Sequence, residues 1–201
     1  MVGRRAEILD GALSVLAGQG MRGLTHRAVD AAARLPAGST SYYFRSRAAL
    51  VAGCVQRLLE RDLEGDVPAA EAALPAATRP GDDPSAALAA ALTAIGVRMA
   101  TTERTRTLAR YELSLAAVRD PALRAELVRG GDTIRHRGAA LLGRAGAADP
   151  DAAAAEVAAV LDGLVYTALV RGPADPEALA AWLRPVQHRV LAALPGLAPR
   201  G

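Results

Sequence analysis

Apolar residues recur every three or four positions along most of this chain, which is the spacing of one face of an α-helix. The pattern is regular over residues 4–17, where the positions that share a face are Leu9, Ala12, Leu13 and Leu16. Gly18 and Gly20 follow, and glycines commonly end a helix. We therefore predict a first helix over residues 4–17.

Two short helices are predicted after it. Thr25 has the side chain of an N-cap and opens the stretch THRAVDAAA, whose inward-facing residues we expect to be Ala28, Val29 and Ala32. This helix must end before Pro36, because the residue that precedes a proline avoids helical angles. Residues 37–44 are predicted to form the next helix, so a tight turn joins the two.

The remaining helices are longer. Ser46 is the predicted N-cap of a helix over residues 46–65, whose inner side has Leu50, Val51, Cys54, Val55 and Leu58. Residues 66–84 contain four prolines, so part of that segment is expected to be a loop. Five further helices are predicted at Ser85–Ala100, Glu103–Val118, Pro121–Gly143, Pro150–Val170 and Pro176–Leu194.

Proline positions support these boundaries. Pro121, Pro150 and Pro176 suit the first turn of a helix, where a missing N–H leaves no hydrogen bond unmade. Pro185 falls inside the last predicted helix, and we expect it to kink or split that helix.

Composition agrees with an all-α protein. Hydrophobic residues make up 51% of the 201 residues, mostly Ala, Leu and Val, with few aromatic residues. The single cysteine, Cys54, excludes an internal disulfide and any zinc site built from several cysteines. Glu7 and Asp10 interrupt what would otherwise be the start of an export signal. The most apolar later segments, near 86–97 and 152–170, have too many small or acidic residues for a membrane span. We expect a soluble, cytoplasmic protein without a membrane partner.

Positive charge is concentrated in the first quarter of the chain. Residues 1–50 contain seven arginines against three acids, a surplus of four positive charges, whereas the whole chain has a net charge of +3. The other 151 residues therefore total −1. A basic N-terminal segment on a nearly neutral body indicates that this segment binds a polyanion. With its short helices and tight turn, it has the layout of a helix-turn-helix DNA-binding domain.

The run GLTHRAVDAAARLPAGSTSYYFRSRAAL resembles the TetR/AcrR-type transcriptional regulators. Its matching features are a Leu-Thr pair, an arginine two places on, an Ala-rich second helix, a small-Gly-Ser segment, aromatic residues that end in Phe, and a Ser-Arg pair before leucine. The match covers residues 5–50. The segments LARYELSLAAVRDPALR and AAVLDGLVYTALVRG look more loosely like regulatory-domain segments of the same proteins.

This resemblance implies an all-α protein with a DNA-binding domain at 1–47 and a larger regulatory domain for ligand binding and dimerisation at 48–201. It implies a regulator, more commonly a repressor, that binds a palindromic double-stranded DNA operator as a homodimer and is released by a small-molecule effector.

Two positions depart from the family pattern. Arg34 stands where the family has a turn glycine, and a φ above zero at that position would cost an arginine roughly 1 kcal/mol relative to glycine. Ser41 replaces the first tyrosine of the family's Tyr-x-x-Phe, so Tyr42 and Tyr43 are expected to take over its phosphate contact.

The expected DNA-binding residues follow from size and hydrogen-bonding chemistry. The leading face of a helix that enters the major groove must be small, and Ala37, Gly38 and Ser39 meet that need. Tyr42 and Tyr43 can direct their hydroxyls at phosphates. Aromatic residues at helical spacing are alternatively core residues, which is the role we assign to Phe44.

Further contacts are expected around these helices. Arg47 occupies the position of a family lysine and is expected to bind a phosphate. Thr25 presents the N-terminus of its helix to the DNA backbone. By the resemblance, Arg27 reaches a base edge and His26 a phosphate.

The last two helices are candidates for dimerisation, because they are apolar on more than one side. The expected interface residues are Val157, Leu161, Leu164, Ala168, Leu179, Leu183, Val186 and Val190. The alternative is a large monomeric core. Polar groups on otherwise apolar helices suggest a ligand pocket, with Met99, Tyr111, Glu112, Leu115, Arg135, His136 and Tyr166 as candidate wall residues. Each of these could instead be a paired structural residue.

A helical enzyme or adaptor that uses the C-terminal cavity without binding DNA is the alternative function. The chain contains no lysine, so it has no Walker P-loop, and it has no HExxH, GxSxG or GxGxxG motif. Its histidines fall in separate predicted helices. We therefore predict no catalytic residue, metal or cofactor, and an adaptor would leave the basic N-terminal segment unexplained.

Overall fold

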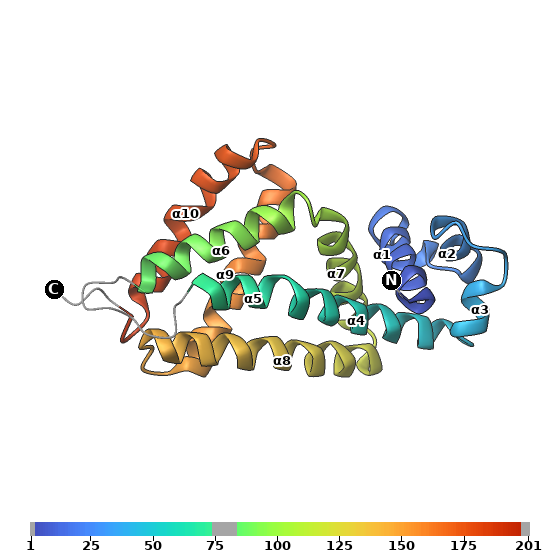
Figure 1. Cartoon of the computed structure of the whole chain (residues 1–201), viewed down its shortest axis with the longest axis horizontal. Coiled ribbons are helices and arrows are strands. Elements are labelled where there is room, and N and C mark those ends of the chain that lie inside the picture. Colours follow the sequence, from blue (N-terminus) through green and yellow to red (C-terminus); the bar gives the residue numbers. More distant parts are fainter. Residues whose placement is uncertain (1–2, 74–83, 198–201) are drawn as a thin grey trace. The chain divides into compact units, whose positions relative to one another are not determined.

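A computed structural model describes residues 3–73 and 84–197, and within those ranges the chain forms ten helices and no strand (Figure 1). The first five are α1 (Arg4–Gly23), α2 (His26–Ala32), α3 (Ser39–Tyr43), α4 (Arg47–Glu64) and α5 (Asp66–Ala73). The others are α6 (Pro84–Ala100), α7 (Arg104–Ala117), α8 (Pro121–Ala145), α9 (Pro150–Arg171) and α10 (Pro176–Ala193). The predicted all-α fold is confirmed.

The chain divides into two compact units. One contains residues 1–61 and 103–131, and the other contains residues 62–102 and 132–201. The first unit thus includes the whole predicted DNA-binding segment together with α7, which packs along α1.

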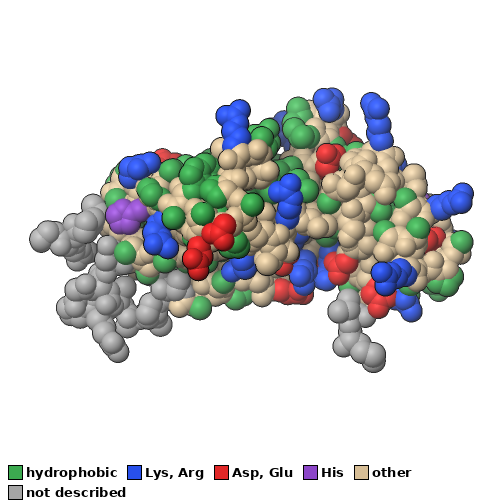
Figure 2. Space-filling view, turned by 90° about the horizontal axis from the view of Figure 1, so that it is seen from above, with side chains coloured by type: hydrophobic (Ala, Val, Ile, Leu, Met, Phe, Trp, Pro, Cys, Tyr) green, Lys and Arg blue, Asp and Glu red, His purple; other side chains and the backbone are tan. Residues whose placement is uncertain are grey.

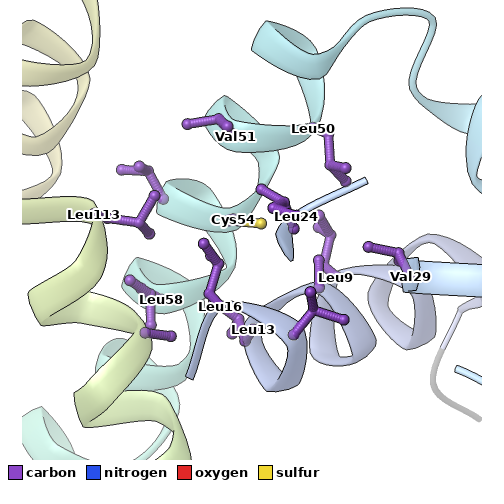
Figure 3. Packing of buried hydrophobic residues seen from close by; sticks show 14 of the residues in the cluster. Leu9, Leu13, Leu16, Leu24, Val29, Leu50, Val51, Cys54, Leu58 and Leu113 are labelled. Carbon is purple, nitrogen blue, oxygen red and sulfur yellow. The ribbon is translucent and has the colours of Figure 1, made fainter. Parts of the chain in front are cut away.

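The core of the first unit is formed by the apolar faces of α1, α4 and α7 (Figure 3). All the inward-facing residues predicted for the first and fourth helices are buried there, with α7 adding Leu113. Phe44 belongs to the same cluster and is only 3% exposed, which confirms its assignment to the core. The guanidinium carbon of Arg5 lies 5.2 Å from the centre of the Phe44 ring.

The helix caps agree with the sequence patterns. The Thr25 hydroxyl accepts a hydrogen bond from the N–H of Ala28 at 3.1 Å, and Ser46 accepts one from Ala49 at 3.1 Å. Asp149 and Asp175 cap α9 and α10, each of which has a proline in its first turn. These side chains accept hydrogen bonds from the first N–H groups of each helix, which have no carbonyl partner within the helix.

Three details differ from the sequence-based expectations. α1 continues to Gly23 instead of ending at residue 17, although Gly20 is kinked out of helical geometry with φ 65°. Residues 66–73 form α5, a helix that was not predicted, and the loop expected within 66–84 is not tested, because residues 74–83 lie outside the described ranges. α10 continues through Pro185 and is not split there.

The second unit is built around α6, which packs on both α9 and α10. One apolar cluster joins α6, α8, α9 and α10, and a smaller one contains Ala100, Ala168, Leu179 and Leu183. A polar pair lies among these apolar residues, because the Thr93 hydroxyl on α6 is 2.5 Å from Oε1 of Gln187 on α10. Both residues are buried.

Candidate nucleic-acid interface

Tyr42 and Tyr43 project from the short helix α3 into solvent. Tyr42 is 71% exposed and Tyr43 is 43% exposed, and their rings meet edge to face with centroids 5.2 Å apart. Thr40 and Phe44, four positions apart, face inward instead and are buried. The helical repeat therefore divides this segment into an anchored side and a side that presents two phenol hydroxyls.

The turn before α3 uses two residues with left-handed backbone angles. Gly38, the N-cap of α3, has φ 91°, a conformation that glycine adopts without a steric cost. Arg34 has φ 55°, and it is the one non-glycine residue with positive φ in the described ranges. The turn thus has the left-handed geometry expected of the family's glycine position, with an arginine in place of the glycine.

Asp30 is a buried acid that the sequence-based expectations missed. Its carboxylate accepts hydrogen bonds from the N–H of Gly38 at 2.8 Å, from the N–H of Thr40 at 2.7 Å and from the Thr40 hydroxyl at 2.5 Å. Of the residues predicted to face inward on α2, Val29 is buried and Ala28 is half-buried against the core. The expectation for Ala32 is wrong, because Ala32 is exposed and Asp30 is buried instead.

The pKa of the Asp30 carboxyl reflects two opposing effects. Burial acts to raise this pKa, since it disfavours the charged form, but the hydrogen bonds from Thr40 and Gly38 and the nearby His26 act to lower it. The net result is a pKa below the ordinary value of 3.8, so Asp30 is ionised at neutral pH. No local capping pattern marks this contact in the sequence, because Asp30 precedes Gly38 by eight positions.

His26 and Arg47 make hydrogen bonds within the first unit. His26 Nε2 donates to the Phe44 carbonyl at 2.8 Å, since a carbonyl oxygen can only accept. The Arg47 guanidinium donates to the carbonyls of Leu24 and Met21 at the end of α1. A guanidinium has five N–H donors, so Arg47 retains others for a second acceptor. The predicted phosphate contacts of these two residues stay predictions.

The other predicted DNA-binding residues lie at or near the surface around α3. Thr25, Arg27, Ala37 and Gly38 are exposed, and Ser39 is half-buried with its hydroxyl donating to the Pro36 carbonyl at 2.7 Å. The exposed arginines of this unit that form no ion pair within the described part of the chain include Arg22, Arg27, Arg34 and Arg45. Figure 2 shows arginines and acids interspersed on the face that it draws.

The predicted ligand-pocket residues are placed as follows. Met99 is buried and Tyr111 is half-buried, whereas Leu115 and Tyr166 are 62% and 61% exposed. Arg135 pairs with the Asp132 carboxylate at 2.8 Å, and His136 Nδ1 lies 2.7 Å from the Asp132 carbonyl. Glu112 accepts a hydrogen bond from the N–H of Met21 at 3.3 Å. The pocket assignment stays a prediction.

An apolar crevice is present in the second unit. It is shallow and partly open to solvent, and it is lined by Leu92, Val157, Val160, Leu161, Gln187, Val190 and Leu191. Gln187 Nε2 is buried there without a hydrogen-bond partner. Three of the predicted dimer-interface residues line this crevice.

The predicted dimer-interface residues differ in burial. Ala168, Leu179 and Leu183 are buried in a core cluster of their own chain and have almost no surface left for a second copy. The others are half-buried, namely Val157, Leu161, Leu164, Val186 and Val190. Two large apolar residues nearby in sequence, Val170 and Trp182, are exposed and were not among the predicted interface residues.

α9 has unusually little burial for its composition. Its most apolar 18-residue window has a mean hydropathy of 1.6, and only 22% of that window is buried. Among the described residues it is the one unbroken helix long and apolar enough to cross a membrane, a test that helices of soluble proteins also pass. No group of three or more His, Cys, Asp or Glu residues that could hold a metal ion occurs in ranges 3–73 and 84–197.

Two family models match the chain. Residues 8–54 match the model described as bacterial regulatory proteins of the tetR family, and residues 83–193 match a tetracyclin repressor-like C-terminal domain. None of the proteins with curated descriptions matches this sequence.

Several solved structures are similar over nearly their full lengths. A TetR-family member from Streptomyces coelicolor A3 is 33% identical, with a TM-score of 0.65 over 93% of this chain and 97% of that one. The multidrug binding protein EbrR in complex with ethidium is 33% identical, with a TM-score of 0.63 over 94% and 98% of the two chains. EbrR in complex with proflavin is 34% identical, with a TM-score of 0.55 over 94% and 99%.

Proposed function

The chain belongs to the TetR family of bacterial regulatory proteins, and we propose that this DNA-binding regulator is a repressor that binds a palindromic operator as a homodimer and leaves it when a small molecule binds. The observation that carries the proposal is the placement of Tyr42 and Tyr43. Two exposed phenol rings stand on a short helix whose opposite side is anchored in the core. Large apolar rings at the surface commonly mark a binding site.

DNA contacts are proposed to divide between the phosphate backbone and the bases. The hydroxyls of Tyr42 and Tyr43 bind phosphates, and the N-terminus of α2 at Thr25 adds backbone N–H donors. Ala37, Gly38 and Ser39 let α3 approach the bases closely, while Arg27 reaches a base edge. Arg47 and His26 are proposed to reach phosphates in addition to their carbonyl contacts. Unpaired arginines nearby supply attraction that does not depend on sequence.

Dimerisation is proposed because one such domain makes few base contacts, whereas two domains can read both halves of a palindrome. The low burial of α9 supports this proposal, since an apolar helix surface in water is normally covered by another protein surface. We propose that Tyr166, Val170 and Trp182 join the half-buried residues Val157, Leu161, Leu164, Val186 and Val190 at this interface.

The effector is proposed to be a small molecule bound within the region 48–201. EbrR binds ethidium and proflavin, which are planar aromatic cations, so these compounds are the first probes for this chain. Effector release requires that the ligand bind the DNA-free form more tightly than the DNA-bound form, because a ligand shifts an equilibrium only by its differential affinity.

A gel-shift titration with DNA from upstream of the protein's own gene tests the proposal. We expect a retarded complex that survives excess random DNA and is dissociated by an effector. A chain that retards no DNA, or retards all DNA equally, would instead favour the helical enzyme or adaptor.

A further inference from the structure

The buried carboxylate of Asp30 connects the two helices of the DNA-binding motif. Asp30 belongs to α2, and its three hydrogen-bond donors come from Gly38 and Thr40 at the start of α3. Gly38 is the N-cap of α3 and Thr40 is its second residue. The carboxylate therefore links α2 to the first residues of α3 across the turn that joins the two helices.

This connection depends strongly on geometry. Asp30 is 5% exposed and Thr40 is 0% exposed, so water cannot replace a lost hydrogen bond without opening the motif. A buried charge is tolerated only when its hydrogen bonds are made, and hydrogen bonds weaken steeply with distance and angle. An apolar contact between the same helices would allow small rotations of α3 at little cost. The polar connection penalises those rotations.

We infer that Asp30 is a positioning residue that sets the orientation of α3 in the major groove, and that it thereby determines how well the protein distinguishes its operator from other DNA. The inference rests on the proposed DNA-binding function. Phosphate contacts come from flexible arginine and tyrosine side chains and tolerate small rotations of the helix, but base contacts require a fixed geometry. Loss of the connection should therefore weaken operator binding much more than binding to random DNA.

A test must separate the effect of charge on DNA affinity from the effect of the position of α3, because Asp30→Asn also removes a negative charge near the DNA-binding surface. Glu7→Gln is a matched control that removes one negative charge from the same unit. Glu7 lies on α1, and its side chain pairs at the surface with Arg4 at 2.7 Å. Both substitutions should strengthen binding to random DNA equally through electrostatics.

The experiment uses the full chain. An operator is selected from a random duplex pool by the wild-type protein, and affinities for it and for a scrambled duplex of equal length are measured by fluorescence anisotropy. We expect Asp30→Asn to lower the ratio of operator affinity to scrambled affinity about tenfold relative to Glu7→Gln, the loss expected for a hydrogen bond to a charged group. Thr40→Val should lower this ratio less, and Thr40→Ser, which keeps the hydroxyl, should retain it.

An equal ratio for Asp30→Asn and Glu7→Gln would overturn the inference. If circular dichroism shows that Asp30→Asn is unfolded, the comparison of Thr40→Val with Thr40→Ser decides, and equal ratios for those two variants would overturn it. A wild-type chain that selects no sequence from the pool would contradict the proposed function, and the inference with it. The two failures are therefore distinguishable by the wild-type result.

Discussion

The carboxylate of Glu112 on α7 accepts a hydrogen bond from the N–H of Met21, 91 positions earlier in the chain. Met21 follows Gly20, whose backbone angles are not helical, so α1 is kinked next to this N–H. On its other side, the carbonyl of Met21 accepts from Arg47 at the start of α4. One residue at the end of α1 is thus held by α7 and by α4.

Removal of the Glu112 carboxylate should destabilise the protein. Glu112→Ala leaves the N–H of Met21 without its acceptor, and we expect a loss of about 1 kcal/mol in the free energy of unfolding. Glu112→Gln keeps a side-chain oxygen that can accept, so it should lose less than Glu112→Ala. Urea unfolding followed by circular dichroism measures both values. Equal stability of Glu112→Ala and wild type would show that the contact contributes nothing.

Arg47 should have two separable effects. Arg47→Ala removes the donors to the carbonyls of Leu24 and Met21, so unfolding should become easier by about 1–3 kcal/mol. If Arg47 also binds a phosphate, the slope of log affinity against log salt concentration should fall by about one unit. DNA titrations at several salt concentrations measure this slope for folded variant protein. An unchanged slope with reduced stability would assign Arg47 to structure alone.

Arg34→Gly should stabilise the protein. Arg34 has φ 55°, which strains any residue with a Cβ, and glycine relieves that strain at the expense of a more flexible unfolded chain. We expect a net gain of about 0.5–1 kcal/mol in the free energy of unfolding. Arg34→Ala is the control, because alanine removes the charge and keeps the strain. A gain in both variants would point to charge repulsion as the cause.

Asp30 should make stability depend on pH in the acid range. Because its pKa in the folded protein lies below the ordinary value of 3.8, its ionised form stabilises the fold. This contribution is fully present well above pH 3.8 and is lost as the pH falls through that value and then through the lower pKa of the folded state. The stability difference between wild type and Asp30→Asn, measured by urea unfolding, should therefore shrink on acidification. A difference that stays constant from neutral to acid pH would contradict this.

A charge on the exposed apolar side of α9 should prevent dimerisation. Val170 is 62% exposed in the single chain, so Val170→Glu should leave the monomer fold intact while placing a carboxylate in the proposed interface. Light scattering should show a dimer for wild type and a monomer for the variant. Val118→Glu is a suitable control, since Val118 is 78% exposed and lies outside α9 and α10. A variant that remains dimeric would place the interface elsewhere.

Local patterns in the chain were sufficient to predict most helices and their caps. Thr25, Ser46 and the prolines at the starts of α8, α9 and α10 act on backbone groups within a few residues, so their effect can be read from neighbouring positions. The apolar faces of α1 and α4 were predictable for a similar reason, because several turns of regular spacing specify one side of a long helix. The departure from the family pattern at Arg34 was also visible, but only the structure showed that the arginine keeps a positive φ there.

Contacts between distant positions required the tertiary structure. α2 has only seven residues, which is too short for the spacing of apolar residues to specify its buried face. Asp30 is buried there, whereas Ala32, which was expected to face inward, is not. Glu112, Arg47 and His26 have polar groups that suit a ligand or a phosphate, yet packing brings each one to a backbone group of its own chain. Helix formation depends on neighbours in sequence, whereas the partner of a buried or half-buried polar group depends on which helices meet, and only the packed structure specifies that.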